Sequence, residues 1–249
     1  MTPRVSVVVP AYRCAATVAE AVRSALNGTL REIEVIAVDD GSGDETPAVL
    51  ERLRSEDARV RVIALPKNNG VANARNTGVA AANAEWIAFL DSDDLWEADK
   101  LIRQLETADR TGASLVYTAA ACIDEAGNPT GKVFRVPETV TANALLFGND
   151  LITSTVLVRK ELAARHPMER SDLHEDLICW YGILKDGATA AGIDEPLVRY
   201  RVSKGSKSGD KSKSARMTWN TYKHLGVGFC KRIVCFIGYC LHGVKRYWL

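Results

Sequence analysis

Three carboxylates within four residues are the strongest chemical signal in the sequence. Asp91-Ser92-Asp93-Asp94 follows directly on the apolar run 86–90. Like charges packed this closely repel each other unless a cation or solvent relieves them. Asp91 and Asp93 could together hold a hard divalent ion, Mg²⁺ or Mn²⁺, while the phosphates of a bound substrate fill its remaining positions. The alternative is that Asp93 and Asp94 cap the helix that follows and complement its dipole.

A second acidic pair, Asp39 and Asp40, precedes Gly41 and Ser42 at the end of another apolar run. One of these carboxylates could accept a hydrogen bond from the imide N–H of uracil or from a ribose hydroxyl, while the Tyr12 ring stacks on the base. The alternative is a plain turn, which Asp, Gly and Ser all favour.

An arginine and two asparagines point to phosphate binding. Asn68-Asn69-Gly70 and Arg75 place amides, a flexible glycine and a guanidinium at the start of a predicted helix. The backbone N–H groups of a helix N-terminus attract phosphate, and a guanidinium pairs with it through parallel hydrogen bonds. Arg75 is therefore a candidate diphosphate contact, with Asn69 beside it. The alternative is that Arg75 is a solvated arginine on the helix surface.

Transfer of a group from a diphosphate to a hydroxyl also needs a base. His174-Glu175-Asp176 supplies two carboxylates just before the predicted helix 177–185, whose Trp180 could wall the site. A carboxylate opposite the leaving diphosphate can take the proton of the attacking hydroxyl in a single displacement. We assign this role to Asp176, with Glu175 helping by orientation or acceptor binding. The alternative is that both acids only complement the helix dipole.

The elements that must position these residues alternate along the first 120 residues. Short β-branched runs predict strands, and amphipathic stretches predict helices. The predicted strands are 5–9, 34–38, 60–64, 86–90 and 114–117, and the predicted helices are 17–26, 46–54, 71–82 and 100–110. This alternation predicts an α/β fold with a mainly parallel central sheet. Ligands of such sheets lie beyond the carboxyl ends of the strands, so residues 10–12, 39–42 and 91–94 should meet at one cleft.

The pattern is weaker beyond residue 122. We predict a turn at 124–127, a short helix at 142–147, a strand at 155–159, a helix at 177–185 and a strand at 197–202. There are neither internal repeats nor a Pro-rich linker. We therefore predict a catalytic domain over residues 1–202, followed by a basic loop and C-terminal amphipathic helices over residues 203–249.

Composition excludes several classes of protein. The chain has 249 residues, and its 32 Lys and Arg nearly cancel its 31 Asp and Glu, so no global field attracts nucleic acid. Its six cysteines contain no CxxC and no histidines at zinc-ligand spacing, which argues against a structural zinc site or a disulfide framework. The first apolar run, 5–9, is closed by Pro10 and is too short for a secretory signal. A cytoplasmic location is expected.

The C-terminal segment is basic and apolar. The run 233–244 is only 12 residues long, whereas a membrane-spanning helix needs about 20. Aromatic residues interleaved with Lys and Arg favour a helix lying in a membrane interface, at the inner leaflet. The alternative is a helix packed on the catalytic domain. The lysines of the preceding Ser- and Gly-rich stretch, which could form a flap over a phosphate, are Lys204, Lys207, Lys211 and Lys213.

Five motifs, in this order, closely resemble those of family 2 glycosyltransferases with the GT-A fold. They are VSVVVPAY from Val5, VDDGS from Val38, Ala74-Arg75-Asn76, LDSDD from Leu90, and Glu175-Asp176. The resemblance covers roughly residues 4–202. It implies a UDP- or dTDP-type sugar donor, a divalent Mn or Mg ion and inversion of configuration. The residues that it implies are Asp93 with help from Asp91 for the metal, Asp176 for inversion, Arg75 for the diphosphate, and Tyr12 and Asp40 for the base. The other residues that we expect to bind the nucleotide are Pro10, Ala11, Asp39, Asn69, Asp91 and Ser92.

The tail, from residue 200 to Trp219, looks like that of bacterial family members that build exopolysaccharide, capsule or teichuronic-type polymers on a lipid carrier. The resemblance thus implies a glycan or lipid-linked acceptor. The QxxRW motif of processive synthases is absent. A sugar nucleotidyltransferase is disfavoured because no Gly-rich basic loop follows Val9, and a dehydrogenase because no GxGxxG does. A non-catalytic protein that binds nucleotide sugar or scaffolds a polysaccharide assembly complex remains the alternative of another class.

Overall fold

The computed structural model describes residues 2–202 and 211–248. Its strands are β1 (Val5–Ala11), β2 (Ile33–Asp39), β3 (Val60–Ala64), β4 (Trp86–Phe89), β5 (Leu95–Trp96), β6 (Leu115–Ile123), β7 (Pro129–Phe134), β8 (Leu157–Arg159) and β9 (Ala190–Arg201). Its helices are α1 (Val18–Leu26), α2 (Thr46–Glu56), α3 (Val71–Ala81), α4 (Lys100–Thr111), α5 (Ala142–Leu145), α6 (Lys160–Arg165), α7 (Glu175–Lys185), α8 (Lys211–His224) and α9 (Phe229–Trp248), with a 3₁₀ turn, η1, at Thr153–Thr155.

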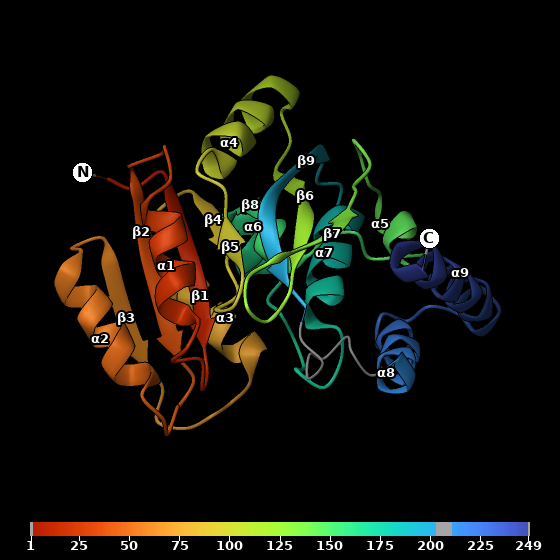
Figure 1. The fold of residues 1–249 in the computed structure, drawn as a ribbon. Helices are drawn as coiled ribbons and strands as arrows, with labels where there is room; N and C mark the ends of the chain where they lie inside the picture. Colours follow the sequence, from red (N-terminus) through yellow and green to blue (C-terminus); the bar gives the residue numbers. More distant parts are fainter. Residues whose placement is uncertain (1, 203–210, 249) are drawn as a thin grey trace.

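The strands form one sheet in the order β3-β2-β1-β4-β8-β6-β9-β5, with β7 paired to β6 (Figure 1). Strands β3, β2, β1 and β4 are mutually parallel. Strand β8 is antiparallel to both β4 and β6, so β6 and its parallel neighbour β9 run in the same direction as β4. The predicted α/β fold with a mainly parallel sheet is confirmed.

Both faces of the sheet are covered, which explains why its central strands, such as β1, β2 and β4, are buried throughout and mostly apolar. Alternate residues of β1 face opposite sides: Val7 belongs to the core beneath α1, α2 and α4, and Val8 to the core beneath α3, α6 and α7. All seven residues of β1 are buried. This two-sided burial makes the first half of the chain easy to interpret from hydrophobicity alone.

The predicted elements of the first 120 residues are all present, although β6 extends to Ile123, six residues beyond the predicted end, and the later elements also differ in length. Strand β9 begins at Ala190, seven residues before the predicted start, because pairing with β6 holds a stretch whose Gly and Asp disfavour strands. Gly192 is needed there, since a Cβ would collide with the Pro137 carbonyl and the Tyr117 ring. Strand β7, which the sequence analysis missed, pairs with β6 alone and begins with a proline.

Helices α8 and α9 lie together at one end of the molecule, beside α5 and α7 (Figure 1). The Tyr222 hydroxyl donates to the Leu146 carbonyl at 2.5 Å, and Cys235 is buried in the same core as α7. One side of α9 therefore packs on the rest of the protein. Among the described helices, none is long and apolar enough to cross a membrane. The domain boundary at 202 stays a prediction, and Lys204 and Lys207 of the predicted flap lie outside the described residues.

Candidate active site

The loops that follow β1, β2 and β4 start side by side at one edge of the sheet, and the cleft expected there stays a prediction. The Asp40 N–H donates to the Ala11 carbonyl at 2.8 Å, and the Leu90 N–H donates to the Val8 carbonyl at 3.0 Å. Pro10 and Ala11 are themselves buried in the strand end. Their backbone thus anchors the neighbouring loops rather than presenting side chains.

Tyr12 is the exposed aromatic group at this edge, with 43% of its surface accessible. The Arg13 guanidinium lies 5.4 Å from the centre of its ring. Arg13 has a φ of 48°, and its N–H donates to Ser42 Oγ at 3.0 Å, which ties the two loops together. An exposed ring held on a fixed loop suits stacking against a planar base.

Asp39 and Asp40 are both buried beneath this edge. Asp40 accepts two backbone hydrogen bonds, from Asn69 N at 2.9 Å and from Gly70 N at 2.8 Å. Asp39 Oδ1 accepts from Ser42 N at 3.2 Å, and this hydrogen bond closes the turn that Asp, Gly and Ser favour. In this conformation Asp40 holds the loop before α3 in place, and its contact with a nucleotide stays a prediction, as does that of Asn69.

Arg75 is the centre of the site. It is 5% exposed, which excludes the alternative of a solvated surface arginine. One guanidinium nitrogen donates to Asp91 Oδ1 at 2.6 Å, and the other to Glu175 Oε1 at 3.2 Å. Burial disfavours the charge, but Asp91, Glu175 and Asp176 outweigh it, so the pKa of Arg75 is raised. Carboxylates from distant parts of the sequence therefore converge on one cation.

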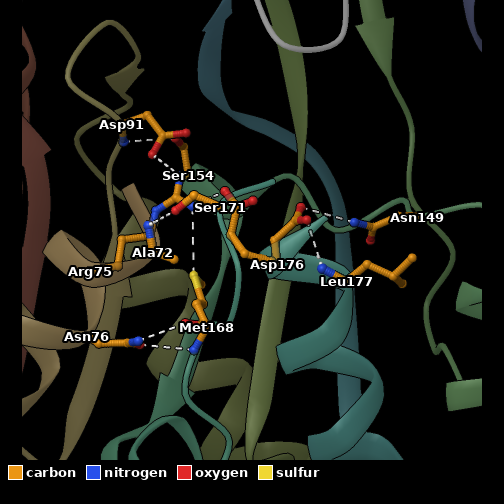
Figure 2. A network of polar contacts seen from close by, with 11 residues as sticks. Ala72, Arg75, Asn76, Asp91, Asn149, Ser154, Met168, Ser171, Asp176 and Leu177 are labelled. Atoms are coloured by element: carbon orange, nitrogen blue, oxygen red, sulfur yellow. Dashed lines mark hydrogen bonds and ion pairs between the residues drawn. The ribbon is translucent and has the colours of Figure 1, made fainter. Parts of the chain in front are cut away.

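A loop after α6 brings the acidic start of α7 to α3 (Figure 2). The Asn76 amide donates to the Met168 carbonyl at 2.7 Å and accepts from the Met168 N–H at 2.9 Å. Ser171 Oγ accepts from Ala72 N at 3.3 Å. These contacts place Glu175 beside Arg75.

Asp176 lies in the first turn of α7 and is half-buried. Its Oδ2 accepts from the Asn149 amide at 3.1 Å, and its Oδ1 accepts from Leu177 N at 2.8 Å (Figure 2). The amide of Asn149 reaches Asp176 from outside its helix, so capping alone does not explain the environment of this carboxylate. A fixed, half-exposed carboxylate is suited to receive a proton.

Asp94 differs from the two acids before it. It is 1% exposed, and its carboxylate accepts from Ser154 Oγ at 2.5 Å and from Arg201 N at 2.9 Å. It therefore neither caps α4, whose N-cap is Asp99, nor is placed to bind an ion. Its two hydrogen bonds join the acidic loop to the main body of the sheet.

Ser154 and Arg201 also position the acids that could bind an ion. Asp91 N donates to Ser154 Oγ at 3.0 Å, and Arg201 Nε donates to the Asp93 carbonyl at 2.8 Å. Arg201 further donates to the carbonyls of Asp124 and Glu125 at 3.3 and 3.0 Å. A buried arginine at the end of β9 thus fixes the backbone of the acidic loop.

The acidic loop fits a divalent cation that is shared with a substrate. Burial, together with the charge of Asp91, raises the pKa of Asp93. Such crowding is what a cation relieves. The oxygen donors suit Mg²⁺ or Mn²⁺. The described part of the chain has no group of three His, Cys, Asp or Glu that could hold an ion.

Three residues of this network were missed by the sequence analysis as parts of the site: Asn149, Ser154 and Arg201. Ser154 has no distinguishing local pattern. Asn149 stands in a polar Gly-Asn-Asp stretch that reads as a turn, and Arg201 was noted only as part of the tail. A basic residue at the end of a strand, on the edge where the acids gather, was the available signal.

A groove of about 600 Å³ lies away from these residues. Its lining includes Leu184 near the end of α7, Thr107 and Arg110 of α4, and Ala190 at the start of β9. Asp176 is at the opposite end of α7, so this groove is not part of the site.

Comparison with known proteins identifies the family. The protein-family model described as "Glycosyl transferase family 2" matches residues 6–163 of this chain. TuaG, a Bacillus subtilis protein named for teichuronic acid biosynthesis, is 34% identical over 245 residues, covering 98% of this chain and 97% of its own. The Escherichia coli UDP-Glc:alpha-D-GlcNAc-diphosphoundecaprenol beta-1,3-glucosyltransferase WfaP is 32% identical over 246 residues, covering 98% of this chain and 95% of its own.

Solved structures agree on the fold. The mannosyltransferase PcManGT from Pyrobaculum calidifontis, in complex with GDP-Man and Mn²⁺, superposes with a TM-score of 0.71 at 19% identity, over 96% of this chain and 69% of that one. With the family model matching more than half of its length, the chain belongs to glycosyl transferase family 2 and has the GT-A fold.

Proposed function

We propose that this protein transfers a sugar, with inversion, from a UDP- or dTDP-type donor to a hydroxyl of a glycan or lipid-carrier-linked acceptor in bacterial surface polysaccharide synthesis. It acts with a bound Mn²⁺ or Mg²⁺ as a peripheral protein at the inner membrane face. The observation that carries the proposal is the convergence of Asp91, Glu175 and Asp176 on Arg75.

The donor would lie along the edge formed by the β1, β2 and β4 loops. Tyr12 offers its exposed ring to the base. Asp91 and Asp93 would hold the cation, which neutralises charge on the diphosphate when bound. Arg75, whose buried Nε has no partner in the described structure, would attract the diphosphate through its positive charge.

Asp176 is proposed as the base that takes the proton of the acceptor hydroxyl. Two hydrogen bonds hold its carboxylate, and its partial exposure admits an acceptor. Attack from the Asp176 side while the diphosphate leaves towards Asp91 would invert the anomeric centre in a single displacement. Glu175, paired to Arg75, keeps the two halves of the site together.

Relatives support the substrate classes. WfaP is named for a UDP-glucose donor and a diphosphoundecaprenol acceptor, and PcManGT was solved with a sugar nucleotide and Mn²⁺. Both names agree with a nucleotide-sugar donor, and the name of WfaP also agrees with an acceptor on a lipid carrier. Neither name decides the sugar that this chain moves.

Release of nucleoside diphosphate from a panel of sugar donors, with and without Mn²⁺, tests the proposal. Asp176→Asn should lower turnover by about 10²- to 10⁴-fold while donor binding is retained. Asp93→Ala should remove the dependence on metal. The matched control is Asp186→Asn at the other end of α7. The Asp186 side chain is 54% exposed, and its substitution should leave turnover unchanged. Donor binding without turnover of any donor, in wild-type protein, would instead favour the non-catalytic scaffold.

A further inference from the structure

Helix α9 exposes a continuous apolar stripe. Its members recur at spacings of three and four residues and fall within an arc of about 140° at ~100° per residue. They are between 40% and 66% exposed, although all are large and apolar. The α9 stripe consists of Phe229, Ile233, Val234, Ile237, Leu241 and Val244.

The orientation of the stripe is fixed by the opposite side of the helix. Cys235 is buried, and the Phe236 ring meets the Trp219 ring edge-on at 5.5 Å. His242 Nε2 lies 2.9 Å from Asp150 Oδ1. Because these contacts hold one side of α9 against the protein, the α9 stripe must face outwards. Large apolar patches on a protein surface are sites of interaction.

The positive charge of the C-terminal helices indicates the kind of partner that the α9 stripe contacts. Residues 211–249 contain eight of the 32 Lys and Arg and none of the 31 Asp and Glu. The rest of the chain is therefore acidic on balance. Lys231 on α9 and Lys223 on the neighbouring helix α8 are both exposed. A second copy that docked through the same stripe would bring like charges together, which disfavours a symmetric dimer.

An anionic bilayer satisfies both features. An amphipathic helix that lies in the membrane interface buries its apolar side among acyl chains while cationic side chains reach lipid phosphates. A helix of 20 residues would extend about 30 Å along the surface. We propose that the α9 stripe docks this protein in the interface of an anionic phospholipid bilayer. The α9 stripe would thus be the surface through which the protein makes the membrane contact of the proposed function. This proposal rests on that function only in that a lipid-linked acceptor would reach the site from the membrane.

Vesicle flotation tests the proposal without substrate or metal. The probes are vesicles of phosphatidylcholine with about 30% phosphatidylglycerol, and vesicles of phosphatidylcholine alone. The wild-type chain should float with the anionic vesicles, and binding should fall at least about tenfold on neutral vesicles or in about 0.5 M salt. Ile237→Glu with Leu241→Glu should reduce binding to anionic vesicles by at least about tenfold, since two charges would enter the acyl region.

The control carries the same two charges elsewhere. Ala80→Glu with Ala164→Glu alters exposed positions on α3 and α6 and should bind like wild type. Circular dichroism checks that each variant is folded, and the α9 substitutions are exposed enough to be tolerated. Wild type that stays off anionic vesicles, or an Ile237→Glu/Leu241→Glu variant that binds undiminished, overturns the proposal. A wild-type dimer that the same variant dissociates, with no vesicle binding, would assign the stripe to self-association.

Failure here is distinct from failure of the proposed function. Donor turnover is measured in solution with Asp176→Asn as its reference, and vesicle binding is measured with neither donor nor acceptor. A protein that turns over donor but does not bind vesicles would keep the proposed transferase activity, and would lose both the α9 proposal and the proposed membrane location. The reverse result keeps the docking surface and removes the activity.

Discussion

Replacing Arg75 by methionine should destabilise the protein strongly. Arg75 and Glu175 have side chains only 6% and 8% exposed, so solvent cannot substitute for the lost partner. Removing one member of a buried ion pair costs about 3–5 kcal/mol. Asp91 is 28% exposed and can be hydrated in the variant, which places the expected loss near the lower end, at about 3 kcal/mol.

The loss should be partly reversible by a second substitution. Glu175→Gln in the Arg75→Met background removes the uncompensated buried charge and should recover roughly half of the free energy of unfolding. The stability of Arg75→Lys should lie between those of wild type and Arg75→Met, because an ammonium keeps the positive charge but lacks the planar fork whose fixed donor directions match the two carboxylates.

Urea unfolding followed by circular dichroism measures these differences. For an m-value of about 3 kcal/mol/M, Arg75→Met should lower the midpoint by roughly 1 M. The control is Arg52→Met, since Arg52 is 60% exposed and lies 4.0 Å from Glu56, and it should shift the midpoint hardly at all. The reasoning is wrong if Arg75→Met behaves like Arg52→Met, or if Glu175→Gln destabilises Arg75→Met further.

Substitutions at three further positions test separate parts of the structure. Burial lowers the pKa of Lys100, so between its folded and unfolded pKa values the folded protein binds fewer protons than the unfolded chain. The free energy of unfolding of the wild type therefore rises with pH over that interval. Lys100→Met should therefore add about 1 kcal/mol near neutral pH, with a gain that shrinks towards about pH 10; denaturation across pH measures it, and a growing gain would contradict the sign. Asn149→Ala should lower kcat about tenfold with little change in donor affinity, because it frees the Asp176 carboxylate to rotate. Steady-state kinetics measures kcat and calorimetry measures donor affinity. An equal loss of donor affinity would argue against a role of Asn149 in positioning Asp176. Tyr12→Ala should weaken UDP binding by about 1 kcal/mol while Tyr12→Phe should not; calorimetry decides, and equal losses would point to the hydroxyl.

The first half of the fold could be predicted because its strands are buried on both sides. Runs such as 7–9 and 35–38 are apolar without interruption, and the helices between the strands have apolar residues at helical spacing. The second half depends on pairing instead. Strand β5 has two residues, and the start of β9 is an Ala-Ala-Gly stretch that adopts a strand only because β6 lies beside it.

The acidic residues of the site were predictable in kind but not in environment. Their position after parallel strands indicated a shared edge. Asp93 and Asp94 are neighbours with the same side chain, yet one is near the proposed ion and the other is buried against Ser154. That difference depends on β8 entering the sheet antiparallel beside β4, which places residue 154 next to residue 91. No local pattern encodes the order of strands.

The contact between α9 and Asp150 makes the C-terminal helices more than an attachment. Asp150 is adjacent to Asn149, whose amide holds the carboxylate of Asp176. At Gly148, the residue before, even a methyl group would collide with the His242 ring. A shortened chain ending at residue 202 would lose this support from the loop that carries Asn149. We therefore expect the terminal helices to be inherited with the catalytic region as one unit. Grafts from relatives should succeed only when segment 143–150, which comprises the end of α5 and the loop after it, is transferred with them.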